Sequence, residues 1–228
     1  QETTVDLISK RRASRMMAAL FSAALMAACG GGDDDAPASA PAPAPAPGPA
    51  PAPAPATAFA TPADTTATTQ AGGIETYQYA ENGAAQTAGT PAFAASAVSY
   101  GATLASAQGF AGAALRLYAP NNTAFDASGY ARMRIQLRSS TDALLLIKLQ
   151  PTPISADGCT ATAEAVVSST LSELVIDLNS TRFPLPGHCA SGTTINTVRA
   201  GLLAVDVVNP ASTAGAHDLA VGAISLEP

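Results

Sequence analysis

A strict alternation of apolar and polar side chains from Tyr130 to Arg138 is the feature that most constrains the fold of this chain. Because successive side chains of a β-strand point to opposite faces, the segment predicts a strand with one buried face. Further strands are predicted at residues 143–150, 172–179, 202–208 and 219–226, with weaker ones at 92–100 and 113–118. Polar turn formers separate these segments, and no long run has helical periodicity. The pattern predicts an all-β domain, either a sandwich or a barrel.

The chain before this domain has a composition that opposes folding. Three glycines and three aspartates occupy residues 30–35, and an Ala-Pro repeat runs from Ala36 to about Ala56. Proline at alternate positions removes backbone donors and holds the preceding residues extended. We therefore predict a disordered Gly/Asp and Ala-Pro tether over residues 29–73, followed by one domain over residues 74–228. A ligand for an aromatic groove is the alternative interpretation of such a repeat.

Residues 1–28 have the order of a bacterial export signal. A basic stretch at residues 10–15 precedes an apolar run at residues 16–28, and Cys29 follows two alanines. The order resembles a lipoprotein signal peptide, which implies a lipid anchor at Cys29 as the new N-terminus. A membrane-spanning helix is the alternative, but the run is shorter than the about 20 residues that a span needs. Gly30, in place of an aspartate, favours the outer membrane, facing either the periplasm or the cell surface.

Two cysteines remain once Cys29 is assigned to lipid. Because exported proteins meet an oxidising compartment, Cys159 and Cys189 are predicted to form a disulfide. The bridge would close a loop of about 30 residues and contribute roughly 3.5 kcal/mol. A metal site of Cys159, His188 and Cys189 is the alternative, but it lacks a fourth ligand and the usual zinc spacing. We expect no metal and no cofactor.

Three segments of the domain resemble the galactose-binding-like jelly-roll family. They are residues 125–150 (FDASGYARMRIQLRSSTDALLLIKLQ), 172–183 (SELVIDLNSTRF) and 200–227 (AGLLAVDVVNPASTAGAHDLAVGAISLE). The resemblance implies a single β-sandwich of the kind found in many carbohydrate-binding modules. Two features depart from those modules. The stretch from Val221 to Ile224 lacks their aspartate near a structural calcium, and the chain has no tryptophan and five tyrosines for stacking on sugar rings.

The sequence does not indicate catalytic chemistry. It contains no G-x-S-x-G, no H-E-x-x-H and no phosphate-binding glycine loop. Its two histidines, His188 and His217, lie in predicted turns or loops, and no two carboxylates have the placement of a glycosidase pair. We therefore expect that the protein is not an enzyme. The formal net charge of −6 at pH 7 disfavours nucleic acid as a partner.

The polar face of the strand at 130–138 is the candidate ligand site. Its outward residues are Arg132, Arg134, Gln136 and Arg138, spaced about 6.6 Å apart. If Lys148 and Gln150 of the next strand pair beside them, the face becomes a basic, amide-rich patch suited to sugar hydroxyls and carboxylates. The alternative is a solvated face with cross-strand pairs to Glu173 or Asp177.

Together these features predict a membrane-anchored exported lipoprotein that presents a non-catalytic binding domain, with carbohydrate as the favoured ligand class. The alternative is a structural or assembly lipoprotein of the envelope, whose sandwich docks a protein partner. An exposed aromatic side chain beside the arginines would favour sugar. An exposed apolar patch larger than roughly a few hundred Å² would favour a protein partner.

Overall fold

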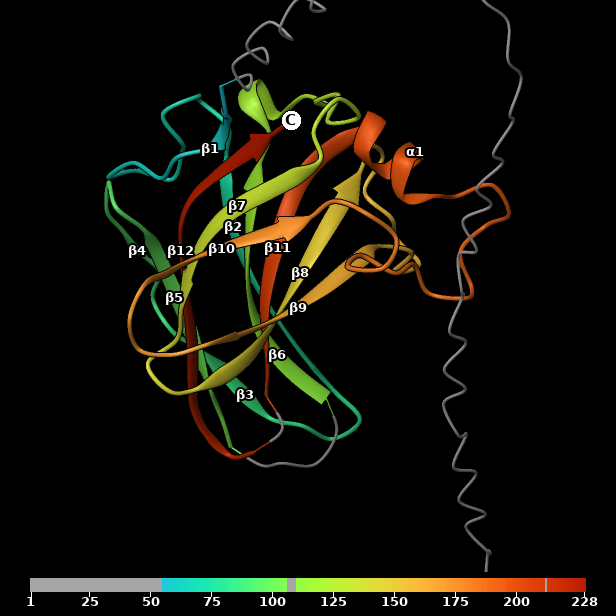
Figure 1. The fold of residues 1–228 in the computed structure, drawn as a ribbon. Coiled ribbons are helices and arrows are strands. Elements are labelled where there is room, and N and C mark those ends of the chain that lie inside the picture. Colours follow the sequence, from blue (N-terminus) through green and yellow to red (C-terminus); the bar gives the residue numbers. More distant parts are fainter. Residues whose placement is uncertain (1–54, 106–109, 212) are drawn as a thin grey trace, which may run out of the picture. The chain divides into compact units, whose positions relative to one another are not determined.

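The computed structural model describes residues 55–105, 110–211 and 213–228, which form two antiparallel β-sheets (Figure 1). The signal peptide, Cys29 and the tether up to residue 54 lie outside the described residues. The seven-stranded sheet has the order β10 (Ser172–Asp177), β7 (Arg132–Arg138), β12 (Gly215–Glu227), β5 (Val98–Leu104) and β3 (Gln86–Ala88), with β1 (Thr57–Ala60) beside β12 and β4 (Ala92–Phe93) beside β5. The five-stranded sheet has the order β2 (Ile74–Glu81), β6 (Phe110–Tyr118), β11 (Leu202–Ala211), β8 (Ala143–Pro151) and β9 (Ala161–Val167). A short helix, α1 (Ile195–Ala200), and a 3-10 turn, η1 (Pro120–Asn122), lie in the connections.

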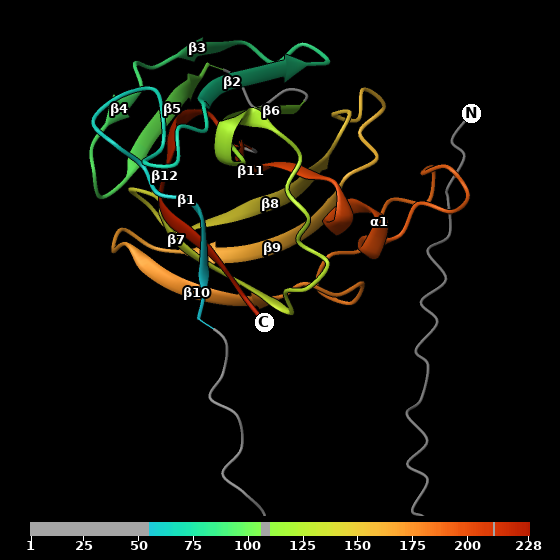
Figure 2. The ribbon, with the colours of Figure 1, turned by 90° about the horizontal axis from the view of Figure 1, so that it is seen from above.

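The two sheets pack face to face, and their inner sides form one hydrophobic core (Figure 2). Met133, Ile135 and Leu137 of β7 are fully buried, as the alternation predicted. The alternate residues of β8 from Leu145 to Leu149 are also fully buried and come from the opposite sheet. Each such side chain contributes about 1.5–3 kcal/mol through its removal from water. The predicted all-β sandwich is therefore confirmed.

The domain begins earlier in the chain than the sequence predicted. β1 pairs antiparallel with β12, and Phe59 is fully buried in the core. Its ring meets that of Phe125 edge-on, with the ring centroids 6.0 Å apart. The boundary predicted at residue 74 is therefore wrong. The Thr- and Ala-rich composition of this stretch indicated a tether, but the buried side chains of Phe59 and Ala60 and the backbone pairing with β12 fix it to the sandwich.

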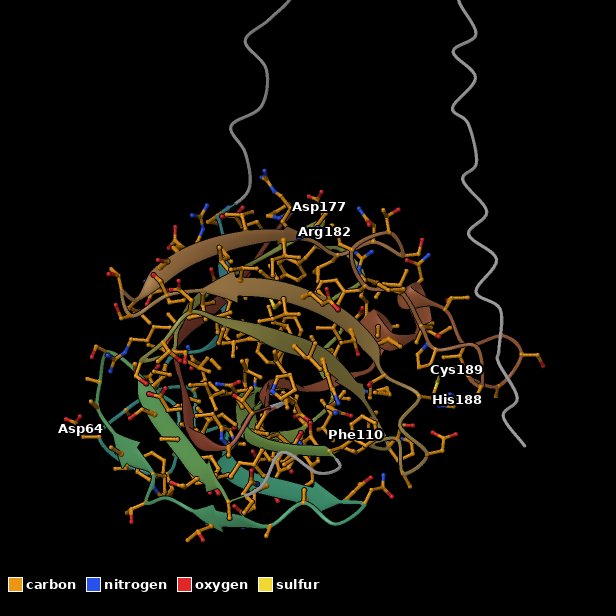
Figure 3. All side chains as sticks on the ribbon, turned by 90° about the horizontal axis from the view of Figure 1, so that it is seen from below. Asp64, Phe110, Asp177, Arg182, His188 and Cys189 are labelled. Carbon is orange, nitrogen blue, oxygen red and sulfur yellow. A yellow bond between two sulfur atoms is a disulfide. The ribbon has the colours of Figure 1, made fainter. Side chains whose placement is uncertain are left out.

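The predicted disulfide is confirmed. Cys159, just before β9, is bonded to Cys189, in the connection between β10 and α1, with the two Cα atoms 5.1 Å apart. The neighbouring His188 is exposed (Figure 3), and its Nε2 atom lies 3.1 Å from the carbonyl oxygen of Asp157. Within the described part of the chain, no three His, Cys, Asp or Glu side chains are grouped to hold a metal ion. The same residues include no helix of the length and apolarity needed to span a membrane.

The position of Phe59 predicts that Phe59→Ala destabilises the domain by about 3–5 kcal/mol, because a buried ring is lost and a cavity remains. Denaturant unfolding of the mature chain measures the change. Phe110→Ala is the matched control, since Phe110 is 68% exposed and its loss should cost within about 0.5 kcal/mol. Equal effects of the two substitutions would contradict the place of β1 in the domain.

Candidate binding face

The predicted site on β7 lies on the outer face of the seven-stranded sheet, between β10 and β12. The Nη2 atom of Arg134 lies 2.6 Å from Oε1 of Glu227, and its Nη1 atom pairs with Glu173. The Nε atom of Arg132 lies 3.4 Å from Oε2 of Glu227. Carboxylates of the same domain thus compensate these two arginines. Glu173 is a partner that the alternative interpretation expected, whereas Glu227 was not predicted.

The other residues proposed for this site do not complete a patch. The Oε1 atom of Gln136 accepts a hydrogen bond from the backbone amide of Ala223 at 3.4 Å, and Arg138 is exposed at the end of β7. β8 pairs with β11 and β9 and not with β7, so Lys148 and Gln150 belong to the other sheet. The expectation that they lie beside the arginines is wrong, because the turn after β7 carries the chain across the core to the opposite sheet.

The outer face of the five-stranded sheet gathers aromatic and charged side chains, and we call it the tyrosine face. Its outward residues are Glu75, Tyr77, Tyr79 and Glu81 on β2; Phe110, Gly112, Ala114, Arg116 and Tyr118 on β6; Ala204, Asp206 and Val208 on β11; Leu144, Leu146, Lys148 and Gln150 on β8; and Thr162, Glu164 and Val166 on β9. The strand register sets Tyr77 opposite Ala114 and Tyr79 opposite Gly112. Large rings on β2 therefore lie beside small residues on β6.

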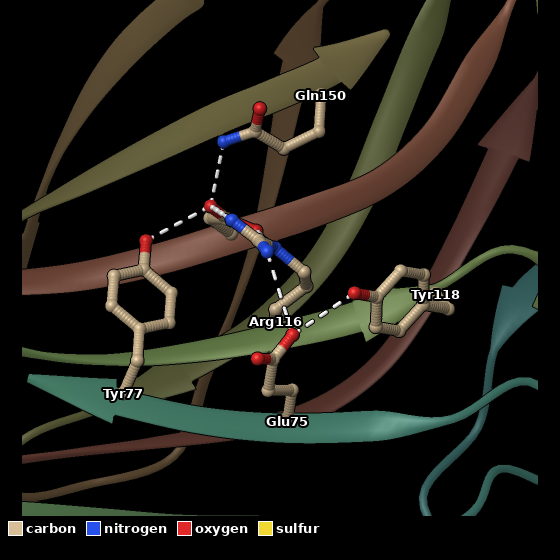
Figure 4. Close-up of polar contacts among 6 residues, drawn as sticks. Glu75, Tyr77, Arg116, Tyr118 and Gln150 are labelled. Atoms are coloured by element: carbon tan, nitrogen blue, oxygen red, sulfur yellow. Dashed lines mark hydrogen bonds and ion pairs between the residues drawn. The ribbon is translucent and has the colours of Figure 1, made fainter. Parts of the chain in front are cut away.

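A hydrogen-bonded network centred on the Asp206 carboxylate joins the strands of this face (Figure 4). Its Oδ2 atom accepts hydrogen bonds from the Tyr77 hydroxyl at 2.9 Å and from Nε2 of Gln150 at 2.6 Å. Arg116 donates to both carboxylate oxygens, from Nε to Oδ1 at 2.7 Å and from Nη2 to Oδ2 at 2.9 Å. The paired geometry of guanidinium and carboxylate adds strength and fixes orientation.

Arg116 extends the network to the edge strand β2. Its Nη1 atom lies 3.4 Å from Oε2 of Glu75, which also accepts a hydrogen bond from the Tyr118 hydroxyl at 2.9 Å. The Arg116 guanidinium also lies over the Tyr77 ring, 5.2 Å from its centroid, which is within the range of a cation–π interaction. The pKa of Tyr77 is raised mainly by burial and secondly by the negative charge of Asp206. The pKa of Arg116 is raised mainly by its hydrogen bonds to Asp206. Both groups therefore keep their protons at neutral pH and remain donors.

The centre of the tyrosine face is closed to solvent. Ala114, Ala204 and Val208 are buried although they point away from the core, Asp206 is fully buried, and Gln150 is 4% exposed. A charge pair in such surroundings interacts more strongly than in water, and its hydrogen bonds polarise one another. The network therefore holds the Tyr77 ring and the Arg116 plane in one orientation.

Tyr79 rests directly on the backbone of the neighbouring strand. A Cβ atom on Gly112 would lie only 2.6 Å from Oη of Tyr79 and 2.7 Å from its Cε1 and Cζ atoms. The ring therefore fits only because residue 112 has no side chain. Gln86 of β3 donates hydrogen bonds from Nε2 to the carbonyl oxygens of Tyr79, at 3.2 Å, and Gly112, at 3.0 Å. These two hydrogen bonds link β2 and β6 at the position of the Tyr79 ring.

A cavity of about 430 Å³ continues the tyrosine face beyond Tyr79. Phe110, Leu144 and Pro210 contribute apolar lining, and His217 of β12 also lines the cavity. Burial lowers the pKa of the His217 imidazole below its ordinary value. The sequence placed His217 in a loop, and this prediction is wrong, because β12 begins at Gly215 and includes His217.

The central polar groups of the tyrosine face are already hydrogen-bonded to one another. The Asp206 carboxylate is fully buried and accepts four hydrogen bonds from the domain itself, three on Oδ2 and one on Oδ1, so no substrate reaches it directly. The face instead exposes aromatic rings held in fixed positions, together with part of the Arg116 guanidinium and the Glu75 carboxylate.

Two features of the sequence are signals for this face. Asp206 interrupts the apolar run LLAVDVV, and a charge in a buried strand requires a partner. The segment ETYQY of β2 places a carboxylate and two tyrosines at alternate positions, all on one side of a strand. β2 itself was not predicted, because only Ile74 on its core side is a large apolar residue, while Thr76, Gln78 and Ala80 give little apolar contrast.

Comparison with known proteins gives a fold resemblance alone. No family model and no curated protein matches the chain. A family 11 carbohydrate-binding module from Clostridium thermocellum, in complex with a β-1,3-1,4-mixed-linked tetrasaccharide, is 10% identical, with 75% of this chain and 96% of that chain covered and a TM-score of 0.45. A family 29 carbohydrate-binding module complexed with mannohexaose is 9% identical over 76% of this chain and 93% of that chain, with a TM-score of 0.43. An agarase is 10% identical over 66% of this chain and 23% of that chain, with a TM-score of 0.42. Because these TM-scores are below 0.5, we base no conclusion about function on them.

The raised pKa of Tyr77 predicts a loss of stability in alkaline solution. Below its ordinary value of 10.0 the phenol is protonated in both the folded and the unfolded chain, and its contribution to stability is complete. Above about pH 10 the unfolded chain ionises first, so this contribution falls as the pH rises. Urea unfolding of Tyr77→Phe between about pH 8 and pH 11 should show lower stability at neutral pH but a weaker alkaline decline than the unsubstituted protein. Parallel pH profiles would contradict the burial of this phenol.

Proposed function

We propose that this domain binds carbohydrate, without catalysis, on the tyrosine face. The observation that carries the proposal is the union of four aromatic side chains with a fixed polar network on one sheet. Pyranose rings have apolar faces that pack on aromatic rings, and their hydroxyls both donate and accept hydrogen bonds. Side chains that are already oriented lose little entropy when a ligand binds.

The charge of the face favours a neutral, hydroxyl-rich glycan. The four carboxylates at Glu75, Glu81, Glu164 and Asp206 outnumber the two cations, Arg116 and Lys148. An anionic sugar would meet net electrostatic repulsion, because the Arg116 guanidinium is already paired with the Asp206 carboxylate. Hydroxyl groups, in contrast, find both donors and acceptors.

Substitutions on the two outer faces of the sandwich test where the glycan binds. Tyr77→Ala and Tyr79→Ala should each weaken binding by at least about tenfold, which is ~1.4 kcal/mol. Arg134→Ala, on the other sheet, is the control and should leave the affinity unchanged, because its partners are Glu173 and Glu227. A glycan array with the mature protein identifies the ligand, and titration calorimetry measures the affinities. Loss of binding in Arg134→Ala alone would contradict a site on the tyrosine face and would favour the outer face of β7.

A protein partner is the second candidate for the same face. Phe110 is 68% exposed, Leu144 43% and Val166 76%, and all three point outward from the five-stranded sheet. Exposed apolar side chains of this size are also found where a protein docks. An empty glycan array, combined with a defined envelope partner that is lost in Phe110→Ala, would favour this second candidate.

For the full chain we propose export and lipid attachment at Cys29, with the domain held at the outer membrane by the Ala-Pro tether. The order of basic residues, apolar run and cysteine in residues 10–29 supports this. Cys29→Ser should abolish incorporation of labelled palmitate and leave the precursor uncleaved. Continued labelling of Cys29→Ser would contradict the anchor, and recovery of the protein in inner-membrane fractions would contradict the location.

A further inference from the structure

The aromatic side chains of the tyrosine face are confined to one of its sides. Tyr77 and Tyr79 belong to β2, and Phe110 and Tyr118 belong to β6. The outward residues of β11, β8 and β9 are aliphatic, polar or charged, and none is aromatic. Stacking positions for sugar rings therefore follow two neighbouring strands and do not cross the sheet.

The register of β2 and β6 arranges these rings along the strand direction. Tyr118 and Phe110 mark the two ends of β6, while Tyr77 lies beside Ala114 and Tyr79 beside Gly112 between them. At about 3.4 Å per residue, the eight steps from Phe110 to Tyr118 span about 27 Å. Such a line of rings is long enough for several linked sugars and much longer than one.

Polar groups accompany this line on its β11 side. Arg116 lies on β6 within the line, held by the buried Asp206 of β11, and Lys148 follows on β8. A sugar chain stacked on the rings would therefore present one row of hydroxyl edges to Arg116 and Lys148. The other flank is the free edge of the sheet at β2, where solvent solvates the remaining hydroxyls.

We infer that the domain binds an extended glycan chain lying parallel to β2 and β6, with Tyr118 and Phe110 at its two ends. This inference rests on the proposed carbohydrate function and adds the direction and length of the bound chain. It also assigns Gly112 as a positioning residue, because the absence of a side chain there lets the Tyr79 ring lie on β6 in the middle of the line.

Calorimetric titration with oligosaccharides of increasing length tests the direction. The probes are β-1,4-linked gluco- and manno-oligosaccharides and agaro-oligosaccharides, from disaccharides upward. In at least one series the affinity should rise until the chain spans about 27 Å. Phe110→Ala should lower the affinity by about tenfold for the longest members and by less for the shorter ones. Val166→Ala, an exposed position on β9 of the same face, is the matched control and should have no effect.

The opposite pattern, in which Val166→Ala weakens the longer ligands and Phe110→Ala does not, would overturn the inference by placing the chain across the strands. Binding that depends on Tyr77 but stops rising at a disaccharide would also overturn it, while leaving the proposed function intact. Absence of binding in every series and on the glycan array would instead refute the proposed function.

Gly112→Ala tests the positioning role, because the added Cβ must displace the Tyr79 ring. The affinity for the longest oligosaccharides should fall by about tenfold, as in Tyr79→Ala, while the circular-dichroism spectrum stays that of a folded sandwich. Gly129→Ala is the matched control, since a Cβ there meets nothing within 4 Å. Unchanged affinity in a folded Gly112→Ala protein would show that Tyr79 is not held by this contact.

Discussion

Burial of one side of each long strand against the opposite sheet is the constraint on which the rest of this structure depends. Met133, Ile135 and Leu137 of one sheet are fully buried, and so are Leu145, Ile147 and Leu149 of the other. Because side chains alternate along a strand, a fixed inner face also fixes which residues point outward. The positions of the arginines on β7 and of the tyrosines on β2 thus both follow from the core.

The Asp206–Arg116 pair shows how the tyrosine face tolerates a buried charge. Removing a carboxylate from water costs several kcal/mol, and a single ion pair seldom repays it. Asp206 is instead satisfied by four hydrogen bonds, from Tyr77, Arg116 and Gln150. The same four hydrogen bonds also hold the Tyr77 ring and the Arg116 guanidinium in place. They therefore both offset the desolvation of Asp206 and orient the side chains of the face.

The two outer faces carry charge in different ways. On the seven-stranded sheet, Arg132 and Arg134 share Glu227, and the two arginine side chains are 50% and 37% exposed, so water screens these ion pairs. On the five-stranded sheet, Arg116 has side-chain exposure of 16% and lies between Asp206 and a tyrosine ring. A fixed and partly dry arrangement is better suited to recognising a ligand than an exposed pair.

The sequence by itself determined the all-β class, the five strands β7, β8, β10, β11 and β12, and the Cys159–Cys189 bridge, because alternation and cysteine count are local properties of the chain. It did not determine β1, β2, β3 or β9, whose inward residues are few, small or polar, nor the site. Asp206, Arg116 and Tyr77 are separated by up to 129 positions in the sequence. Only the tertiary structure decided that β2, β6, β11 and β8 are neighbours, since strand order depends on how the whole set of apolar faces packs together, which no single strand pattern specifies.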